Sequence, residues 1–163
     1  MSVVKTYPDP ILSTPVPEFN FSDPPIDTNE LSLTLMSVMN AHNAVGLAAN
    51  QLGLPYRVFV MRSFPENYVC FNPKIVYYGD KTSLGEEGCI SFPNVNIKIK
   101  RAEKIRVRFQ TPTGLIATET FEGLTARVFQ HELDHLDGIL FYNRANRYHR
   151  DKALKGLYNG KRN

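Results

Sequence analysis

The residues of this chain best suited to chemistry form one short run, His131 to His135, with the order His-Glu-Leu-Asp-His. On a helix, two histidines four residues apart project from one face and can bind the same divalent metal ion. Glu132 would then lie beside the first ligand, where a carboxylate can handle the protons of a water molecule at the metal. The run therefore predicts a metal-dependent hydrolytic site.

The sequence around this run favours the helix that the chemistry needs. Leu124, Val128, His131 and His135 recur at a spacing of three to four residues, which places them on one helical face. Gly138 follows shortly afterwards and can end the helix. We therefore expect both histidines to project from one helix.

The third metal ligand is not supplied by the residues that usually supply it in zinc peptidases. One peptidase class places a histidine where this chain has Phe141, and another uses a downstream glutamate, which the stretch 136–163 lacks. Asp137 should point away from the site, while His149 and Asp151 lie in a charged tail that reads as solvated. We therefore expect the third ligand upstream of the histidines.

Two cysteines are available upstream. Cys89 lies in the segment 84–93, which we expect to be a short loop because it contains the glycines 85 and 88 and a proline closes it. Cys70 lies in an apolar, strand-like run at 68–71, where a cysteine usually behaves as a small buried hydrophobe. We favour Cys89 as the thiolate ligand.

At this point three segments of the chain resemble the peptide deformylase family, in the family's order. Val-Gly-Leu-Ala-Ala-Asn-Gln at 45–51 is similar to the first motif, Glu-Gly-Cys-Ile-Ser at 87–91 to the second, and Gln-His-Glu-Leu-Asp-His at 130–135 to the third. The start at 7–12 also resembles the family. One departure is Ala44, where the family usually has glycine. Alanine tolerates positive φ less well than glycine, so the resemblance does not predict the backbone conformation at this wall of the site.

The resemblance implies removal of the formyl group from the N-terminal formylmethionine of newly made polypeptides, with release of formate. It implies a metal held by Cys89, His131 and His135, with Glu132 transferring protons. It also implies that the Gln51 amide and the Ile90 backbone N–H flank the oxygen of the attacked formyl group. The family generally uses iron(II), and a ligand set of two nitrogens and one sulfur also accepts zinc(II), nickel(II) or cobalt(II).

A methionine side chain needs an apolar slot, and the resemblance indicates which residues would form it. Val45, Leu124 and Val128 hold motif positions beside that slot, although they could equally be ordinary core residues. Gly46 and Gly88, from the first two motifs, complete the expected substrate-binding set together with Arg127.

Arg127 leaves two alternatives open, because it lies one helical turn before His131. It could face the site, in which case we expect an altered substrate preference beyond the formylmethionine. It could instead be a solvated arginine on the outer face, which is the alternative we favour.

Length and pattern predict one deformylase-like catalytic domain, residues 1–163, with a short basic C-terminal tail. We expect an α+β fold in which short antiparallel strands pack around a central helix carrying the two histidines. The strands are expected at 57–61, 69–78, 95–100, 105–110 and 115–121, with a turn at 111–114. Another helix is expected to start at Asp27, with Glu30 in a capping box, and to end near His42 as a structural residue.

Composition bears on location and partners. Two unpaired-looking cysteines, no signal-like start and no long apolar span favour the cytoplasm, with neither membrane nor DNA as a partner, and we expect a monomer. From residue 144 onward there are seven Lys or Arg and one acidic residue, although the whole chain carries only +3. This tail could contact ribosomal RNA, or it could be a solvated helix with Leu154 and Leu157 docked on the domain, which we favour.

Two rival functions remain at this stage. A small metallopeptidase could use the same helix, but it would have no need of Gln51 or Cys89. A non-catalytic RNA-binding module could hold a closed structural zinc site, with His149 as a possible fourth ligand and no use for Glu132.

Overall fold

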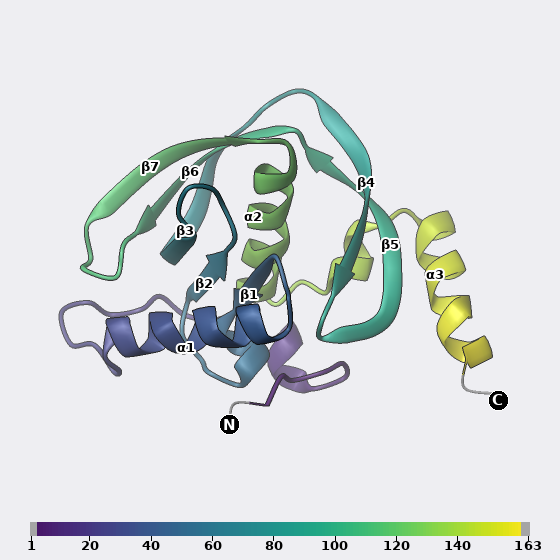
Figure 1. Cartoon of the computed structure of the whole chain (residues 1–163). Coiled ribbons are helices and arrows are strands. Elements are labelled where there is room, and N and C mark those ends of the chain that lie inside the picture. Colours follow the sequence, from purple (N-terminus) through teal and green to yellow (C-terminus); the bar gives the residue numbers. More distant parts are fainter. Residues whose placement is uncertain (1–2, 161–163) are drawn as a thin grey trace.

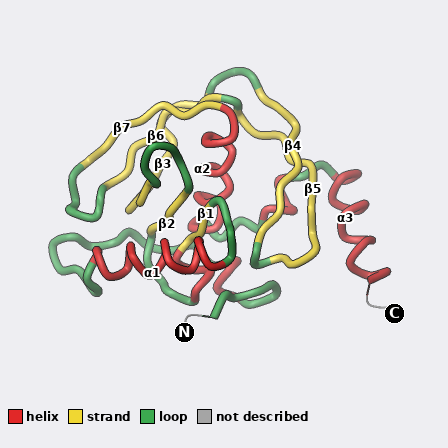
Figure 2. Tube along the Cα trace, in the orientation of Figure 1, coloured by secondary structure: helices red, strands yellow, loops and turns green. Residues whose placement is uncertain are grey.

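The computed structural model describes residues 3–160 of the chain, with side chains as far as residue 155. The helices are α1 (Thr28–Ala41), α2 (Gly123–Leu136) and α3 (Arg147–Gly160), with 3-10 turns η1 (Pro10–Ser13), η2 (Ala49–Leu52) and η3 (Phe141–Arg144). The strands are β1 (Gly46–Ala48), β2 (Val58–Met61), β3 (Tyr68–Tyr78), β4 (Thr82–Cys89), β5 (Phe92–Ala102), β6 (Lys104–Gln110) and β7 (Ile116–Glu122). In Figure 2 strands β3, β6 and β7 lie above α1, and the β4-β5 pair lies between α2 and α3.

The strands of the described chain form two antiparallel sheets. The larger has the order β1-β2-β3-β6-β7, and the smaller is the pair β4-β5. Burial alternates along β5, where Val95, Ile97 and Ile99 are buried and the lysines between and after the isoleucines are exposed. This alternation gives β5 an apolar face toward the core, whereas β1 and β2 are buried at every position.

Helix α2 lies between the two sheets (Figure 1). It contacts β1, β2, β6 and β7 of the larger sheet and β5 of the smaller one, and every residue from Val128 to Leu136 is buried. Gly138 ends the segment with φ +70°, and a Cβ there would lie 2.8 Å from backbone atoms of Thr14 and Pro15. Only glycine therefore fits this C-terminal position, as the sequence predicted.

Helix α1 forms as predicted. The Asp27 carboxylate caps it by accepting a hydrogen bond from the Glu30 backbone N–H at 2.8 Å. Leu31, Leu35 and Met39 are buried against the larger sheet. His42 is the exposed C-cap residue of this helix, as expected for a residue at the helix end.

The α+β class is confirmed, and the expected strands correspond to β2, β3, β5, β6 and β7. The expected turn is also present, since Gly114 N–H donates to the Thr111 carbonyl at 2.8 Å. The expectation of a loop at 84–93 was wrong, because most of that segment forms the β4-β5 hairpin. Its glycines mark close packing: a Cβ on Gly85 would lie 2.8 Å from Arg127, and one on Gly88 would lie 2.8 Å from Asn96.

Helix α3 packs along β5. Ala153 contacts the cluster around Phe92, and Leu154 is half-buried, whereas the side chain of Leu157 lies outside the described residues. Within residues 3–160 no helix combines the length and the apolarity that crossing a membrane requires.

Candidate active site

Three potential metal ligands converge where the end of β4 meets α2. Cys89, His131 and His135 each offer an atom within 4.8 Å of the others, and Cys89 Sγ lies 3.2 Å from His135 Nε2. Ligand atoms of a tetrahedral zinc-type site lie ~3.5 Å apart, as follows from bond lengths of about 2.0–2.3 Å. The separations and the donor types of this group therefore fit a divalent metal ion. Cys70 is buried in β3, away from the group.

Glu87 orients the first histidine. Its Oε1 atom lies 2.8 Å from His131 Nδ1, which leaves His131 Nε2 available to a metal. Burial opposes protonation of His131, but hydrogen bonds to Cys89 and Glu87 outweigh it and raise the pKa to about 10 in the metal-free protein. Burial lowers the pKa of His135 well below its usual value, and its Nδ1 atom has no hydrogen-bond partner within the part of the chain that the structure describes.

A network of buried charges supports this arrangement. Arg101 donates to both oxygens of Glu87 at 2.9 Å and to Asp134 at 2.6 Å, and Arg144 donates to Asp134 from the surface side. Burial alone would raise the pKa of Glu87, but hydrogen bonds from Arg101 and His131 prevail and lower it to about 2. Glu87 is therefore a carboxylate at neutral pH.

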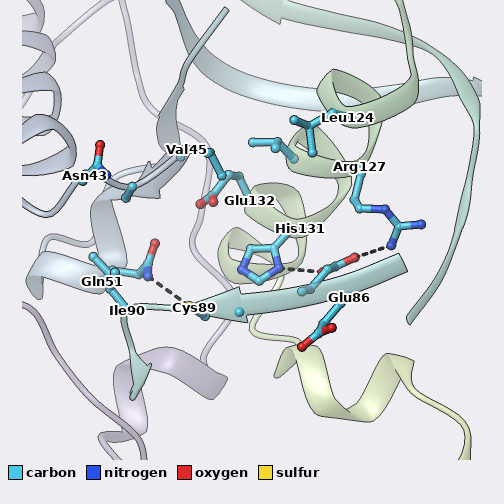
Figure 3. Close-up of a pocket in the computed structure, with 15 residues that line it drawn as sticks. Asn43, Val45, Gln51, Glu86, Cys89, Ile90, Leu124, Arg127, His131 and Glu132 are labelled. Atoms are coloured by element: carbon cyan, nitrogen blue, oxygen red, sulfur yellow. Dashed lines mark hydrogen bonds and ion pairs between the residues drawn. The ribbon is translucent and has the colours of Figure 1, made fainter. Parts of the chain in front are cut away.

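Glu132 differs from the buried acids Glu87 and Asp134 because no described residue forms an ion pair with it. Glu132 is only 3 % exposed, and its Oε2 atom has no hydrogen-bond partner in the described structure. Burial raises the pKa of Glu132 to about 7. Its carboxyl group points into the space that also faces His131 (Figure 3). A group with this pKa can both accept and donate a proton near neutral pH.

Gln51 is held so that its amide nitrogen faces the cysteine. Gln51 Oε1 accepts from the Ala48 backbone N–H at 2.9 Å, and Nε2 lies 3.0 Å from Ser91 Oγ and 3.4 Å from Cys89 Sγ. The amide nitrogen therefore lies beside the proposed thiolate ligand, and Gln51 lines the cavity with Cys89 (Figure 3).

A cavity of about 340 Å³ opens onto these groups. The predicted site residues that line it come from the segment of β1 and η2, from the end of β4 with the turn after it, and from α2. They are Val45, Gly46, Gln51, Gly88, Cys89, Ile90, Leu124, Arg127, Val128, His131 and Glu132. Val45 is 50 % and Leu124 69 % exposed, so the core alternative was wrong for both. Val128 is buried, packs in the hydrophobic core and also lines the cavity.

The favoured alternative for Arg127 was also wrong. Its side chain is only 12 % exposed, lines the cavity and pairs with Glu87 at 2.7 Å. A solvated outer face was expected from the length and charge of arginine, but the carboxylate on β4 makes the inward position favourable. The expected change in substrate preference stays a prediction.

The substitution at Ala44 is accommodated without backbone strain. The neighbouring Asn43 takes the left-handed conformation, with φ 50°, and Ala44 is not among the described residues with positive φ. Asparagine tolerates this region better than most residues do. The wall of the site is therefore formed without the usual glycine.

Sequence reasoning missed Arg101, Asp134 and the role of Glu87. One signal was available: the inward positions of β5 run Val95, Ile97, Ile99 and then Arg101, so an arginine occupies a buried register. A buried guanidinium needs carboxylate partners, which directs attention to acids near the metal ligands. Of the other candidate ligands, Asp137 points away and pairs with Arg57 at 2.8 Å. His149 is not in the metal-binding group found among the described residues.

Comparisons with known proteins agree with this site. The family description "Polypeptide deformylase" matches residues 1–151. A peptide deformylase of Thermotoga petrophila is 38% identical over 145 residues, covering 86% of this chain and 85% of the relative. A class I type b peptide deformylase of Acinetobacter baumannii, solved with Met-Ala-Ser bound, has a TM-score of 0.81 at 32% identity, covering 88% of this chain and 99% of the other. The peptide deformylase of Plasmodium falciparum, solved with an inhibitor, has a TM-score of 0.87 at 27% identity, covering 99% of this chain and 100% of the other.

The family match spans most of the chain, and the relative from Thermotoga petrophila is similar along most of both sequences. The fold agrees as well, since the solved deformylases superimpose over nearly all of their length. The chain therefore belongs to the polypeptide deformylase family, metal-dependent hydrolases that remove the N-formyl group from nascent polypeptides.

Proposed function

We propose that this chain deformylates N-terminal formylmethionine with a divalent cation held by Cys89, His131 and His135, and with Glu132 as the proton carrier. The single observation that carries the proposal is a buried carboxyl oxygen with no hydrogen-bond partner among the described residues, on the residue next to a metal ligand and at the wall of a cavity. A structural metal site has no use for such a carboxylate, since desolvating it costs stability.

When bound, the cation would supply Lewis acidity and lower the pKa of a water molecule in its open coordination position. Glu132 in its carboxylate form accepts the proton of the attacking water, and its pKa of about 7 leaves a large fraction in that form at neutral pH. The same group then donates the proton to the departing amine. The bond between the formyl carbon and the amine nitrogen breaks, and formate and a free amino terminus result.

Gln51 and Ile90 are proposed to stabilise the negative charge that develops on the formyl oxygen. The Gln51 amide is fixed by its bond to the Ala48 backbone N–H, so its donors are oriented before the reaction. The Ile90 backbone N–H lies on the segment directly after Cys89, at the same wall of the cavity.

Replacing Gln51 by Leu is expected to lower kcat about a hundredfold, because one preorganised donor is lost. KM should change by less than about threefold, since the donor acts mainly in the transition state. Steady-state kinetics on a formyl-methionyl peptide measure both constants. A rise in KM with unchanged kcat would contradict this role.

Replacing Gly46 by Ala is expected to lower kcat about a hundredfold by moving Glu132. A Cβ at this position would lie 2.6 Å from Glu132 Oε1 and 2.9 Å from both Cδ and Cγ, so the Glu132 side chain must shift from Cγ outward. Ser37→Ala, at an exposed position of α1 that does not line the cavity, is the control and should keep the parent kcat. Equal kcat for Gly46→Ala and the parent would show that the close contact has no catalytic consequence.

The methionine side chain of the substrate is proposed to enter the cavity beside Val45, Leu124 and Val128. Exposed apolar side chains at a cavity mouth favour an apolar ligand. The Acinetobacter baumannii protein with Met-Ala-Ser bound adds support, since that peptide begins with methionine.

Iron(II) is proposed as the native metal, as the family resemblance implies, and zinc, nickel and cobalt are expected to occupy the same ligands. Zinc binds more tightly than iron(II) to such ligands, so protein isolated in air should hold zinc.

We further propose that residues 1–163 form one catalytic domain that acts as a monomer in the cytoplasm, binds no DNA and processes nascent chains. Exposed basic residues on α3, such as Arg147, give it a surface that could touch ribosomal RNA. Salt-sensitive cosedimentation with ribosomes tests this partner, and equal pelleting at low and high salt would oppose it.

The experiment that tests the proposed function is an assay of formate release. Protein loaded with nickel(II) or anaerobically with iron(II) should release formate from a formyl-methionyl peptide and leave the corresponding acetylated peptide and its internal amides intact. Cleavage of internal amides would favour the peptidase alternative. A tightly metal-loaded but inactive protein would favour the structural site.

A further inference from the structure

The proposed metal ligands come from two parts of the fold that no sheet pairing joins. Cys89 ends β4, whereas His131 and His135 belong to α2. The β4-β5 pair shares no ladder with the larger sheet among the described residues. The distance between the sulfur and the imidazoles therefore depends on contacts between this strand pair and the helix.

Arg127 makes the broadest of these contacts. From α2 it donates through Nη1 to Glu87 Oε2 at 2.7 Å and to the Ile99 carbonyl at 2.8 Å. Through Nη2 it donates to the Ser83 carbonyl at 2.8 Å and to Ser83 Oγ at 3.3 Å. Among the described side chains of α2, Arg127 alone has hydrogen bonds to both β4 and β5.

The other polar links from α2 reach one strand each. Gln130 bonds to the backbone of Ala102 on β5, Asp134 to Arg101 on β5, and His131 to Glu87 on β4. Space for the Arg127 guanidinium exists because Gly85 has no side chain, as a Cβ there would lie 2.8 Å from Arg127 Cζ. The strand and the arginine thus fit each other.

Glu87 makes this contact relevant to the metal. One of its oxygens is shared by His131 and Arg101, and the other by Arg101 and Arg127. If Arg127 is removed, the second oxygen keeps only one partner and the carboxylate can rotate away from His131. Loss of the Ser83 and Ile99 bonds also frees β4, which carries Cys89.

We propose that Arg127 is a positioning residue that fixes β4 and Glu87 against α2, and thereby sets the affinity of the site for its metal. This role rests on the proposed function of the Cys89, His131 and His135 group. It differs from recognition of an acidic substrate, because both terminal nitrogens of Arg127 already donate to protein oxygens and its charge is paired with Glu87.

The test compares nickel(II) affinities, measured by competition with a chelator, for the parent and for Arg127→Met, which keeps an apolar stem of similar length. The expected result is a dissociation constant 10- to 100-fold higher in the variant, the usual range for groups that orient a metal ligand. Arg127→Lys keeps the charge near Glu87 but cannot make the full set of bonds, so its affinity should fall between the two. Arg106→Met, which removes an exposed arginine of β6, is the control and should match the parent.

A second measurement separates positioning from general loss of stability. The absorption spectrum of the cobalt(II) protein reports the geometry of the thiolate and the imidazoles, and it should change in Arg127→Met and not in Arg106→Met. The nickel affinities of Arg127→Met, Glu87→Gln and the double variant should be non-additive if Arg127 acts through Glu87.

Nickel affinity of Arg127→Met within twofold of the parent would overturn the proposal. If that variant does not fold, an Arg127→Lys affinity equal to the parent's would overturn it equally. A parent protein that does not bind nickel at all would instead remove the proposed function, so the two failures are distinguishable.

Discussion

Replacing Glu132 by Gln is expected to lower kcat about a thousandfold, the loss typical of a general acid–base group. Glutamine keeps the size of the side chain but cannot take up the proton of the attacking water at neutral pH. The carboxylate is not one of the three proposed ligands, so the variant should bind the parent's amount of metal. Formate release and metal content, measured on the same sample, check both expectations.

The control for this substitution is Glu122→Gln, which changes an exposed glutamate immediately before the same helix. It should keep the parent's kcat and metal content. A Glu132→Gln protein with full activity would contradict the assignment of the proton carrier. A Glu132→Gln protein that loses its metal would show that the carboxylate instead supports the ligands.

Replacing Arg101 by Met is expected to lower the free energy of unfolding by about 3–5 kcal/mol, the usual cost of removing one partner from a buried ion pair. The Arg101 side chain is 4% exposed and lies between the carboxylates of Glu87 and Asp134, at 5% and 7%. Without the Arg101 guanidinium, the buried carboxylates of Glu87 and Asp134 lose the cation that they share, and each keeps one arginine partner, Arg127 and Arg144 respectively. Denaturant unfolding of the metal-free protein at pH 7 measures the difference, with the exposed Arg108→Met on β6 as the control.

The same variant has an expected dependence on pH. Because the folded-state pKa of Glu87 is lowered from 4.5 to about 2, its ionised form adds stability to the parent above pH 4.5, and this contribution is lost as the pH falls toward 2. In Arg101→Met the Glu87 carboxyl group should protonate more readily. The difference in the free energy of unfolding between the variant and the parent should therefore become smaller as the pH falls from 4.5 toward 2. If this difference in the free energy of unfolding did not change with pH, lost packing and not lost charge pairing would explain the destabilisation.

Local patterns were sufficient to predict α1, α2 and the spacing of their key residues. Asp27 and Glu30 define a helix start by chemistry within four residues, and His131 and His135 share a face by the period of the helix alone. The alternation in β5 and β6 likewise reflects one buried face. These features depend on neighbours in the sequence, which is why the sequence reveals them.

The parts that escaped prediction depend on partners distant in the chain. Glycines at 85 and 88 suggested a loop, but they lie in β4, where they pair with Ile99 and Asn96 of β5. The space beside them is occupied by Arg127 and Asn96, which leaves no room for a Cβ. Arg127 was expected in solvent because its partner, Glu87, lies 40 residues away. The carboxylate partners of Arg101 are likewise 14 and 33 residues distant. Such pairings follow from the tertiary packing of β4 and β5 on α2.

X-ray absorption of the zinc-loaded protein identifies the atoms bound to the metal and therefore tests the proposed ligands. We expect one sulfur at about 2.3 Å and three lighter atoms at about 2.0–2.1 Å, two from imidazoles and one from solvent. In Cys89→Ala the sulfur signal should disappear, while Cys70→Ala should retain it. A parent spectrum without sulfur, or one in which four protein ligands fill the metal's coordination shell, would show that Cys89, His131 and His135 do not form an open metal site.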